Sequence, residues 1–156
     1  MDKKTQIQNL IKSQKLSTAE ECSMFDSALC ALWNNVEVDD IDDLLKAFSD
    51  DTEQDEIMFS LLHLVESLDS DESLQKIALL TPEMQGAEEW AKLLNRRILN
   101  SEQHCAKYRK LISALPAYHA KTACRMSYDR KSLKASRHIS RRKGNNGIRH
   151  SLVSKV

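Results

Sequence analysis

The chain of 156 residues is long enough for one domain that buries roughly two thirds of the surface its unfolded form exposes. It holds only 3 Gly, 2 Pro and 5% aromatic residues, which favours helices and argues against a sheet protein. We therefore expect an all-α protein. No apolar run approaches the roughly 18 residues of a membrane span, so we also expect it to be cytoplasmic and without membrane contact.

The neutral total charge hides a strong asymmetry along the chain. Residues 1–90 contain 21 Asp and Glu against 6 Lys and Arg, whereas residues 91–156 contain 2 against 17. The two parts therefore have net charges of −15 and +15. Such a split predicts a charged partner, or contact between the acidic and basic parts within the fold. Scattered, solvated charge would give the same total.

The first two predicted helices cover about residues 3–15 and 17–34. The second has the stronger signal, because Ser17 and Glu20 have the spacing of a capping box, in which two side chains bind backbone amides at the helix start. Its apolar stripe, expected to face the core, consists of Phe25, Leu29, Leu32 and Trp33.

The cysteines at positions 22, 30, 105 and 124 form no CxxC pair. Cys22 and Cys30 lie two helical turns apart, roughly 12 Å, which is too far for a disulfide. We therefore expect reduced, partly buried thiols.

The acidic stretch that follows predicts two more helices. A short one begins at Asp39 or Asp40, and the next runs from Glu53 to Leu68. Their carboxylates exceed the one or two, roughly, that each helix start needs. An acidic ridge can imitate nucleic-acid phosphates and capture a basic partner, although a solvated face that aids solubility is the alternative. The ridge would comprise Asp39, Asp40, Asp42, Asp43, Asp50, Asp51, Glu53, Asp55 and Glu56.

Three helices complete the predicted domain. They cover about residues 72–80, a stretch that starts at Thr81 and Pro82 and ends at Asn100, and residues 101–115, before Pro116. The connections are short, so we expect antiparallel helical hairpins that form a compact bundle or an α-α solenoid. The domain would span residues 1–120.

A basic extension, residues 121–156, follows this domain. It contains 11 Lys and Arg against one Asp, and the sequence GNNG at 144–147 cannot continue a helix. We expect it to be partly disordered. It could bind the phosphates of RNA or DNA without reading sequence, or fold back on the acidic ridge.

No enzyme motif is found along the chain. The five histidines form no HExxH and no ligand-spaced cluster, and there is no GxGxxG, GxxxxGK[ST] or GxSxG. We therefore expect no catalysis, no metal, no cofactor and no small-molecule substrate.

Polar residues beside two apolar stripes suggest a contact between helices. In the helix at 53–68, His63 and Glu66 lie beside the apolar stripe and can pair. In the helix that ends at Asn100, Trp90 shares a face with Arg97. We expect Arg97 to reach Glu66 on an antiparallel neighbour, with Trp90 packed alongside and Arg96 solvated. A direct role of these residues in binding is the alternative.

Two segments, MFSLLHLVESL (58–68) and EEWAKLLNRRILNSE (88–102), resemble the immunity protein 30 family of bacterial polymorphic toxin and contact-dependent growth inhibition systems. The likeness covers about residues 40–115. The positions that match the family's motifs, which we expect to be mainly structural, are His63, Glu66, Trp90, Arg97 and Asn100.

The resemblance implies a cytosolic protein that binds and neutralises the toxic C-terminal domain of an effector, a nuclease in many such systems. The acidic ridge is then the expected toxin-binding surface. A nucleic-acid-associated adaptor that uses the basic extension, or a helical scaffold for a structural partner, remains the alternative.

Overall fold

The computed structural model describes residues 2–117, and over that range it is helical throughout, without a strand. This confirms the predicted all-α class. The predicted basic extension lies outside the described residues. The helices are α1 (Lys3–Lys12), α2 (Ala19–Leu32), α3 (Ile41–Leu45), α4 (Asp55–Ser67), α5 (Asp71–Leu80), α6 (Glu88–Asn100) and α7 (Cys105–Ala114), with 3₁₀ turns η1 (Val38–Asp40) and η2 (Thr81–Glu83).

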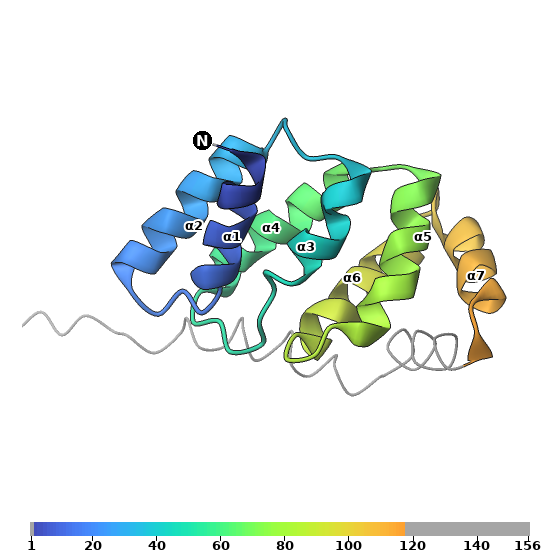
Figure 1. Cartoon of the computed structure of the whole chain (residues 1–156). Helices are drawn as coiled ribbons and strands as arrows, with labels where there is room; N and C mark the ends of the chain where they lie inside the picture. Colours follow the sequence, from blue (N-terminus) through green and yellow to red (C-terminus); the bar gives the residue numbers. More distant parts are fainter. Residues whose placement is uncertain (1, 118–156) are drawn as a thin grey trace, which may run out of the picture.

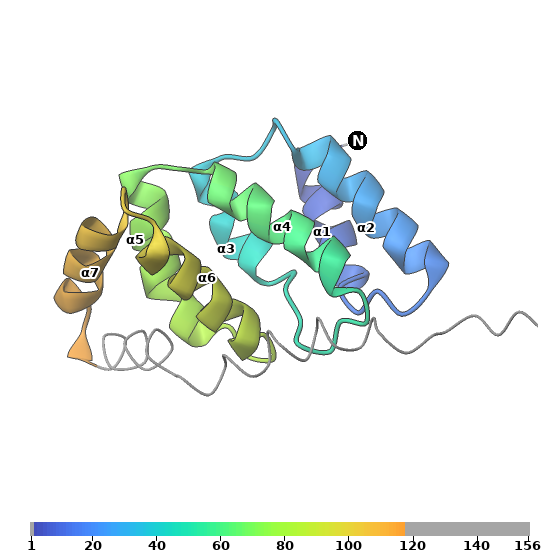
Figure 2. The same ribbon diagram turned by 180° about the vertical axis from the view of Figure 1, so that it is seen from behind.

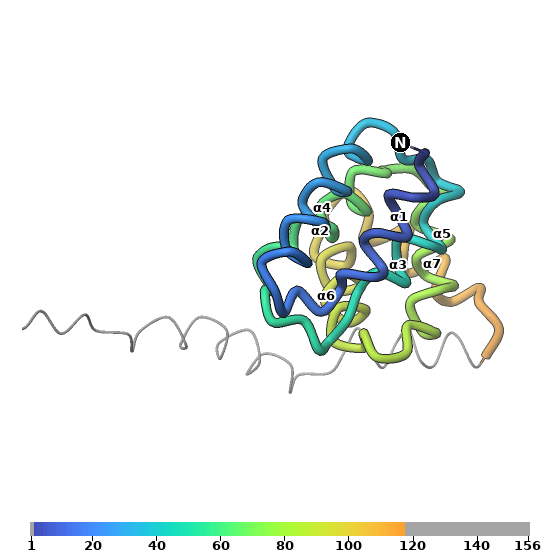
Figure 3. Tube along the Cα trace, turned by 60° about the vertical axis from the view of Figure 1, so that its left-hand side comes forward, coloured from blue at the N-terminus to red at the C-terminus, as the bar shows by residue number. Residues whose placement is uncertain are grey.

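The helices stack in two layers, with α1, α3 and α5 on one side and α2, α4 and α6 on the other (Figure 1; Figure 2 shows the reverse side). The tube in Figure 3 shows both layers edge-on. Helix α7 closes one end of the stack against α5 and α6. Because consecutive helices run in opposite directions, helices within one layer run parallel, as in an α-α solenoid.

The start of α2 differs by one residue from the predicted capping box. Thr18, not Ser17, is the N-cap: its Oγ1 accepts a hydrogen bond of 3.1 Å from the Glu21 amide. The Glu21 carboxylate accepts a hydrogen bond of 2.7 Å from the backbone amide of Ser17, the residue before the cap. The two hydrogen bonds expected between residues 17 and 20 are therefore made by residues 17, 18 and 21.

The starts of α6 and α7 also lie later than predicted. Thr81 and Pro82 form the turn η2, and Gly86 then takes a positive φ of 74°, so α6 begins only at Glu88. A positive φ is readily adopted by glycine and interrupts a right-handed helix. Ser101 contributes its backbone carbonyl, which accepts from the amides of His104 and Cys105, and α7 begins at Cys105.

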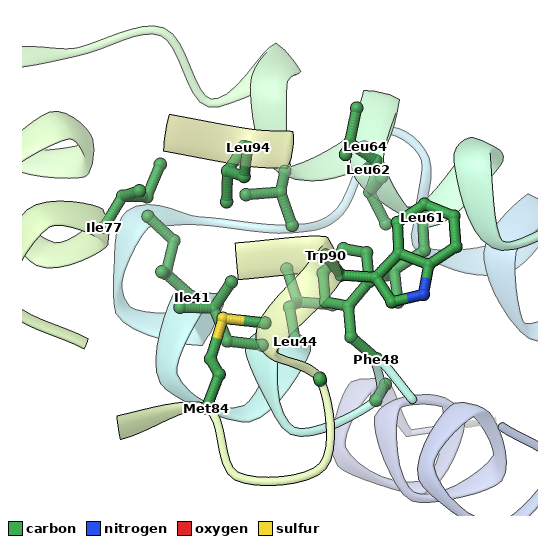
Figure 4. Packing of buried hydrophobic residues seen from close by; sticks show 14 of the residues in the cluster. Ile41, Leu44, Phe48, Leu61, Leu62, Leu64, Ile77, Met84, Trp90 and Leu94 are labelled. Atoms are coloured by element: carbon green, nitrogen blue, oxygen red, sulfur yellow. The ribbon is translucent and has the colours of Figure 1, made fainter. Parts of the chain in front are cut away.

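The core is one apolar cluster that runs through both layers. Figure 4 shows its centre, where Ile41, Leu44 and Phe48 of the α3 region meet α4, Ile77 of α5 and Trp90 and Leu94 of α6. The predicted stripe of α2 is buried at Phe25, Leu29 and Leu32, but Trp33 is 46% exposed. Trp33 follows the last residue of α2 and lies about 100° around the helix from Leu32, so it points off the buried face.

Three cysteines in the described residues, Cys22, Cys30 and Cys105, are free thiols. Cys22 and Cys105 are half-buried as expected, whereas Cys30 is exposed on α2. Cys124 lies outside the described residues.

Candidate functional site

Arg97 and Glu66 form the predicted contact between helices. Arg97 donates from Nε to Glu66 Oε1 at 2.5 Å and from a terminal nitrogen to Oε2 at 2.9 Å. The hydrogen bond to Glu66 raises the pKa of Arg97. The side chains remain 41% and 25% exposed, so this is a two-point ion pair at the surface whose contribution to stability is modest.

The predicted direction of the two helices was wrong. Phe59 of α4 contacts Trp90 of α6, and seven residues further along each helix Glu66 contacts Arg97. Pairs that advance together along both helices require a parallel arrangement. Helix α5 lies between α4 and α6 in the chain, and two reversals of direction restore the original one.

Trp90 has a separate role at the other end of α6. Its ring lies 5.2 Å from Phe59 in an edge-to-face arrangement and 5.8 Å from Phe48, measured between ring centroids. Its Nε1 donates to the Ser49 carbonyl at 3.0 Å. Trp90 therefore packs inside the domain, two helical turns from Arg97 rather than beside it.

Three other residues of the motif helices lie at the surface or partly so. His63 and Asn100 are exposed, and the structure shows no pairing of His63 with Glu66. Arg96, expected in solvent, is half-buried and has an interaction of its own. Arg97 makes the expected contact with Glu66, and it is nevertheless more exposed than Arg96.

A shallow groove of about 470 Å³ lies where α4 and α6 end and α5 and α7 begin. Its walls include the apolar side chains of Val65, Leu74 and Ile98. Glu66, Arg97 and Asn100 also line it, as do His104 and Asp69, which approach to 3.2 Å. Within residues 2–117 no group of His, Cys, Asp and Glu is arranged to hold a metal ion.

Eight of the nine predicted toxin-binding carboxylates fall into two clusters. Asp40 pairs with Lys3 at the start of α1. The Glu53 amide donates to the carbonyl of Lys15, which lies beyond the end of α1. A helix of 10 residues separates these points by about 15 Å. We name them the upper cluster, Asp39, Asp40, Asp42 and Asp43, and the lower cluster, Asp51, Glu53, Asp55 and Glu56.

The carboxylates of the upper cluster are largely committed within the chain. Asp39 pairs with Lys76 at 2.8 Å, and Asp43 with Lys46 at 2.6 Å. Asp40 binds Lys3 and also accepts from the Glu37 amide in a capping box around η1. The hydrogen bond to Lys76 lowers the pKa of Asp39. These residues join η1 and α3 to α1 and α5.

Asp50 belongs to neither cluster, because it caps α6 from a distant part of the chain. Its carboxylate accepts from the Glu89 amide at 3.1 Å, and its own amide donates to the Gly86 carbonyl at 2.8 Å. Burial raises the pKa of Asp50, although the amides of Glu89 and Trp90 oppose that shift. Sequence reasoning missed this role, since the capping residue is 39 positions from the helix it caps.

In the lower cluster, no ion pair engages Asp51, Glu53 or Asp55 within residues 2–117. Asp51 and Glu53 are exposed, Asp55 is half-buried, and Glu56 is exposed but has an interaction of its own. Asp51 and Glu53 are therefore exposed carboxylates that form no ion pair within that range. The fold and the surface together define a small all-α domain in which charged side chains pair between helices or cap helix ends.

A protein-family model, Immunity protein 30, matches residues 12–108, which is more than half of the chain. The chain belongs to the immunity protein 30 family, and it is thereby an immunity protein that acts against a toxin. The match extends further towards the N-terminus than the resemblance at residues 40–115, and includes all of α2. Families of this kind are generally non-enzymatic.

Searches of curated proteins and of solved structures gave no match. Among the described residues, no helix is long and apolar enough to cross a membrane.

Proposed function

We propose that the toxin neutralised by this immunity protein acts through a nuclease domain, and that the neutralisation takes place in the cytoplasm. The immunity protein binds that domain and covers its substrate groove by steric and electrostatic occlusion. A nuclease groove must attract phosphates and is therefore basic. Residues 2–117 carry 22 Asp and Glu against 12 Lys and Arg, a net charge of −10, so the domain complements such a groove.

The lower cluster carries this proposal. Its residues Asp51, Glu53 and Asp55 form no ion pair within residues 2–117, so they can contact a basic partner without exchanging one. Asp39, Asp40 and Asp43 would first exchange a lysine. Complementary charge at the edge of an interface mainly accelerates association. We therefore assign the lower cluster to the first encounter with the toxin, and place the upper cluster, with Asp50, among residues whose first task is structural.

The direct test is co-purification of the full chain with the C-terminal toxin domain encoded by the gene immediately upstream. Growth of cells that express the toxin domain, with and without the immunity protein, is measured in parallel. One-to-one capture with restored growth supports the proposal. Absence of both refutes it, and capture of a domain without nuclease activity refutes the nuclease assignment.

Charge reversal tests the lower cluster. Asp51→Lys with Glu53→Lys should slow association with the toxin domain by about tenfold at low salt, with a smaller effect at high salt. Glu72→Lys with Glu102→Lys is the matched control, because it changes the net charge equally on exposed residues beyond the other end of α4. Equal slowing by both pairs would show that only net charge matters, and the lower cluster would lose its assignment.

A further inference from the structure

The outer face of α2 differs from the rest of the surface in its lack of charge. Residues 22–36 contain one charged residue, Asp26, although 29% of the whole chain is charged and about four would be expected in such a stretch. Helix α2 packs against α1 and α4, so half of it faces outward. An exposed helix normally carries its charges on that side.

The side chains on this face have the composition of an interface centre. Interfaces are depleted in charge at the centre and enriched in Trp and Met. Of the three large apolar residues exposed in the described part of the chain, two, Met24 at 43% and Trp33 at 46%, border this face. Between them lie small exposed residues that allow close approach of another backbone: Ser23, Ser27, Cys30 and Ala31.

Carboxylates stand at both ends of the face. Glu20 and Glu21 are in the first turn of α2, and Glu37 and Asp39 follow its other end with side chains 77% and 88% exposed. Lys3 is shared between Glu37 and Asp40, and Lys76 pairs with Asp39. Two lysines thus face three carboxylates, which leaves that end with a negative charge. A centre whose only charged residue is Asp26, with acidic ends, fits a partner that has an apolar patch among basic residues.

We propose that the outer face of α2, with Trp33 as its anchor, is the surface that holds the basic toxin domain in the complex. The inference rests on the proposed function and adds to it the contact that determines how slowly the complex dissociates. A second copy of the chain is a poorer occupant. In a two-fold dimer with antiparallel α2 helices, the acidic start of each helix would meet the acidic end of the other.

The test compares two variants of the full chain with their matched controls. Trp33→Ala should weaken binding of the toxin domain at least about 30-fold, mainly through faster dissociation, because the largest exposed aromatic contact of the face is lost. Ser27→Lys should weaken it similarly, because the complex would bury an unpaired charge against the partner's apolar patch. Leu79→Ala on α5, where Leu79 is 41% exposed, and Ser27→Ala should each stay within threefold of the native chain.

Fluorescence gives an independent readout. Trp90 is only 7% exposed, so a blue shift of emission on addition of the toxin domain should come from Trp33 and disappear in Trp33→Phe. Circular dichroism confirms that each variant is folded. If both α2 variants bind within threefold of the native chain while native protein still protects cells, the inference is wrong and the proposed function stands.

Two other outcomes would also overturn the inference. If light scattering shows that the α2 variants abolish a dimer without loss of toxin capture, a second copy occupies the face. If the native chain neither captures the toxin domain nor protects cells, the proposed function fails, and the inference fails with it.

Discussion

The buried polar contact among Asn95, Tyr108 and Thr81 allows a quantitative test of how α6 and α7 are joined. All three residues have no exposed surface. Asn95 Nδ2 donates to Thr81 Oγ1 at 2.9 Å and to the Ala91 carbonyl at 2.8 Å, and the Tyr108 hydroxyl donates to Asn95 Oδ1 at 2.7 Å. Burial raises the pKa of Tyr108, so its hydroxyl keeps the proton that it donates.

Tyr108→Phe removes one hydrogen bond and leaves Asn95 Oδ1 buried without a partner. An unsatisfied buried acceptor costs about 1–3 kcal/mol, so the free energy of unfolding should fall by that amount. Asn95→Ala should cost about 2–4 kcal/mol, because it removes both donors and the acceptor and leaves a small cavity. The double variant should lose about 1 kcal/mol less than the sum of the two, since both changes remove the same hydrogen bond.

Urea unfolding followed by circular dichroism measures these free energies, and Tm should fall by about 4 °C for each kcal/mol. Ser113→Ala is the control, because it removes an exposed side-chain hydrogen bond in the same helix and should change stability by less than about 0.5 kcal/mol. Additive losses in the double variant, or a Tyr108→Phe variant as stable as the native chain, would refute the reasoning.

Three further predictions concern the remaining contacts. The raised pKa of Asp50 means that folding favours its protonated form. Its contribution to the free energy of unfolding is therefore complete below pH 3.8 and is lost as pH rises through its pKa in the folded state. Asp50→Asn should therefore be at least as stable as the native chain at pH 7, and its Tm should depend less on pH. Asp50→Ala should be about 1 kcal/mol less stable than Asp50→Asn, because the side chain that caps α6 is lost. Arg97→Ala should cost only about 0.5–1 kcal/mol in urea unfolding, less at high salt; a larger loss would mean that Arg97 does more than pair with Glu66. A chain that ends at residue 120 should keep the helical content and Tm of the full chain, and a lower Tm would place part of the extension within the domain.

The local signals in the sequence were enough to predict the helices. Carboxylates and small hydroxyl residues before apolar stripes located α2, α4 and α5 closely, because caps and stripes act within one or two turns. The start of α6 was missed because Thr81 and Pro82 also suit a 3₁₀ turn. The single glycine at position 86 was the signal that separated that turn from the helix.

Contacts between distant segments were predicted less well. The pairing of Glu66 with Arg97 followed from residue type and spacing, but its parallel geometry required counting α5 between the two helices. No local pattern indicates that Asp50 caps α6. Asn95 did carry a signal: it lies on the buried face of α6 together with Ala91 and Ile98, where a polar side chain must find partners. The assignment of the acidic residues to toxin binding stays a prediction.

The contacts between the loop after α3 and the start of α6 have a consequence for how the domain unfolds. In a simple stack of hairpins, each hairpin touches only its neighbours, and the ends can open while the middle stays folded. Here the Ser49 carbonyl and the Asp50 backbone and carboxylate hold a segment 36–41 residues ahead, through Gly86, Glu89 and Trp90. Neither half of the stack can open at this point without exposing Trp90 and freeing the first amides of α6. We therefore expect the domain to unfold in one cooperative transition rather than hairpin by hairpin.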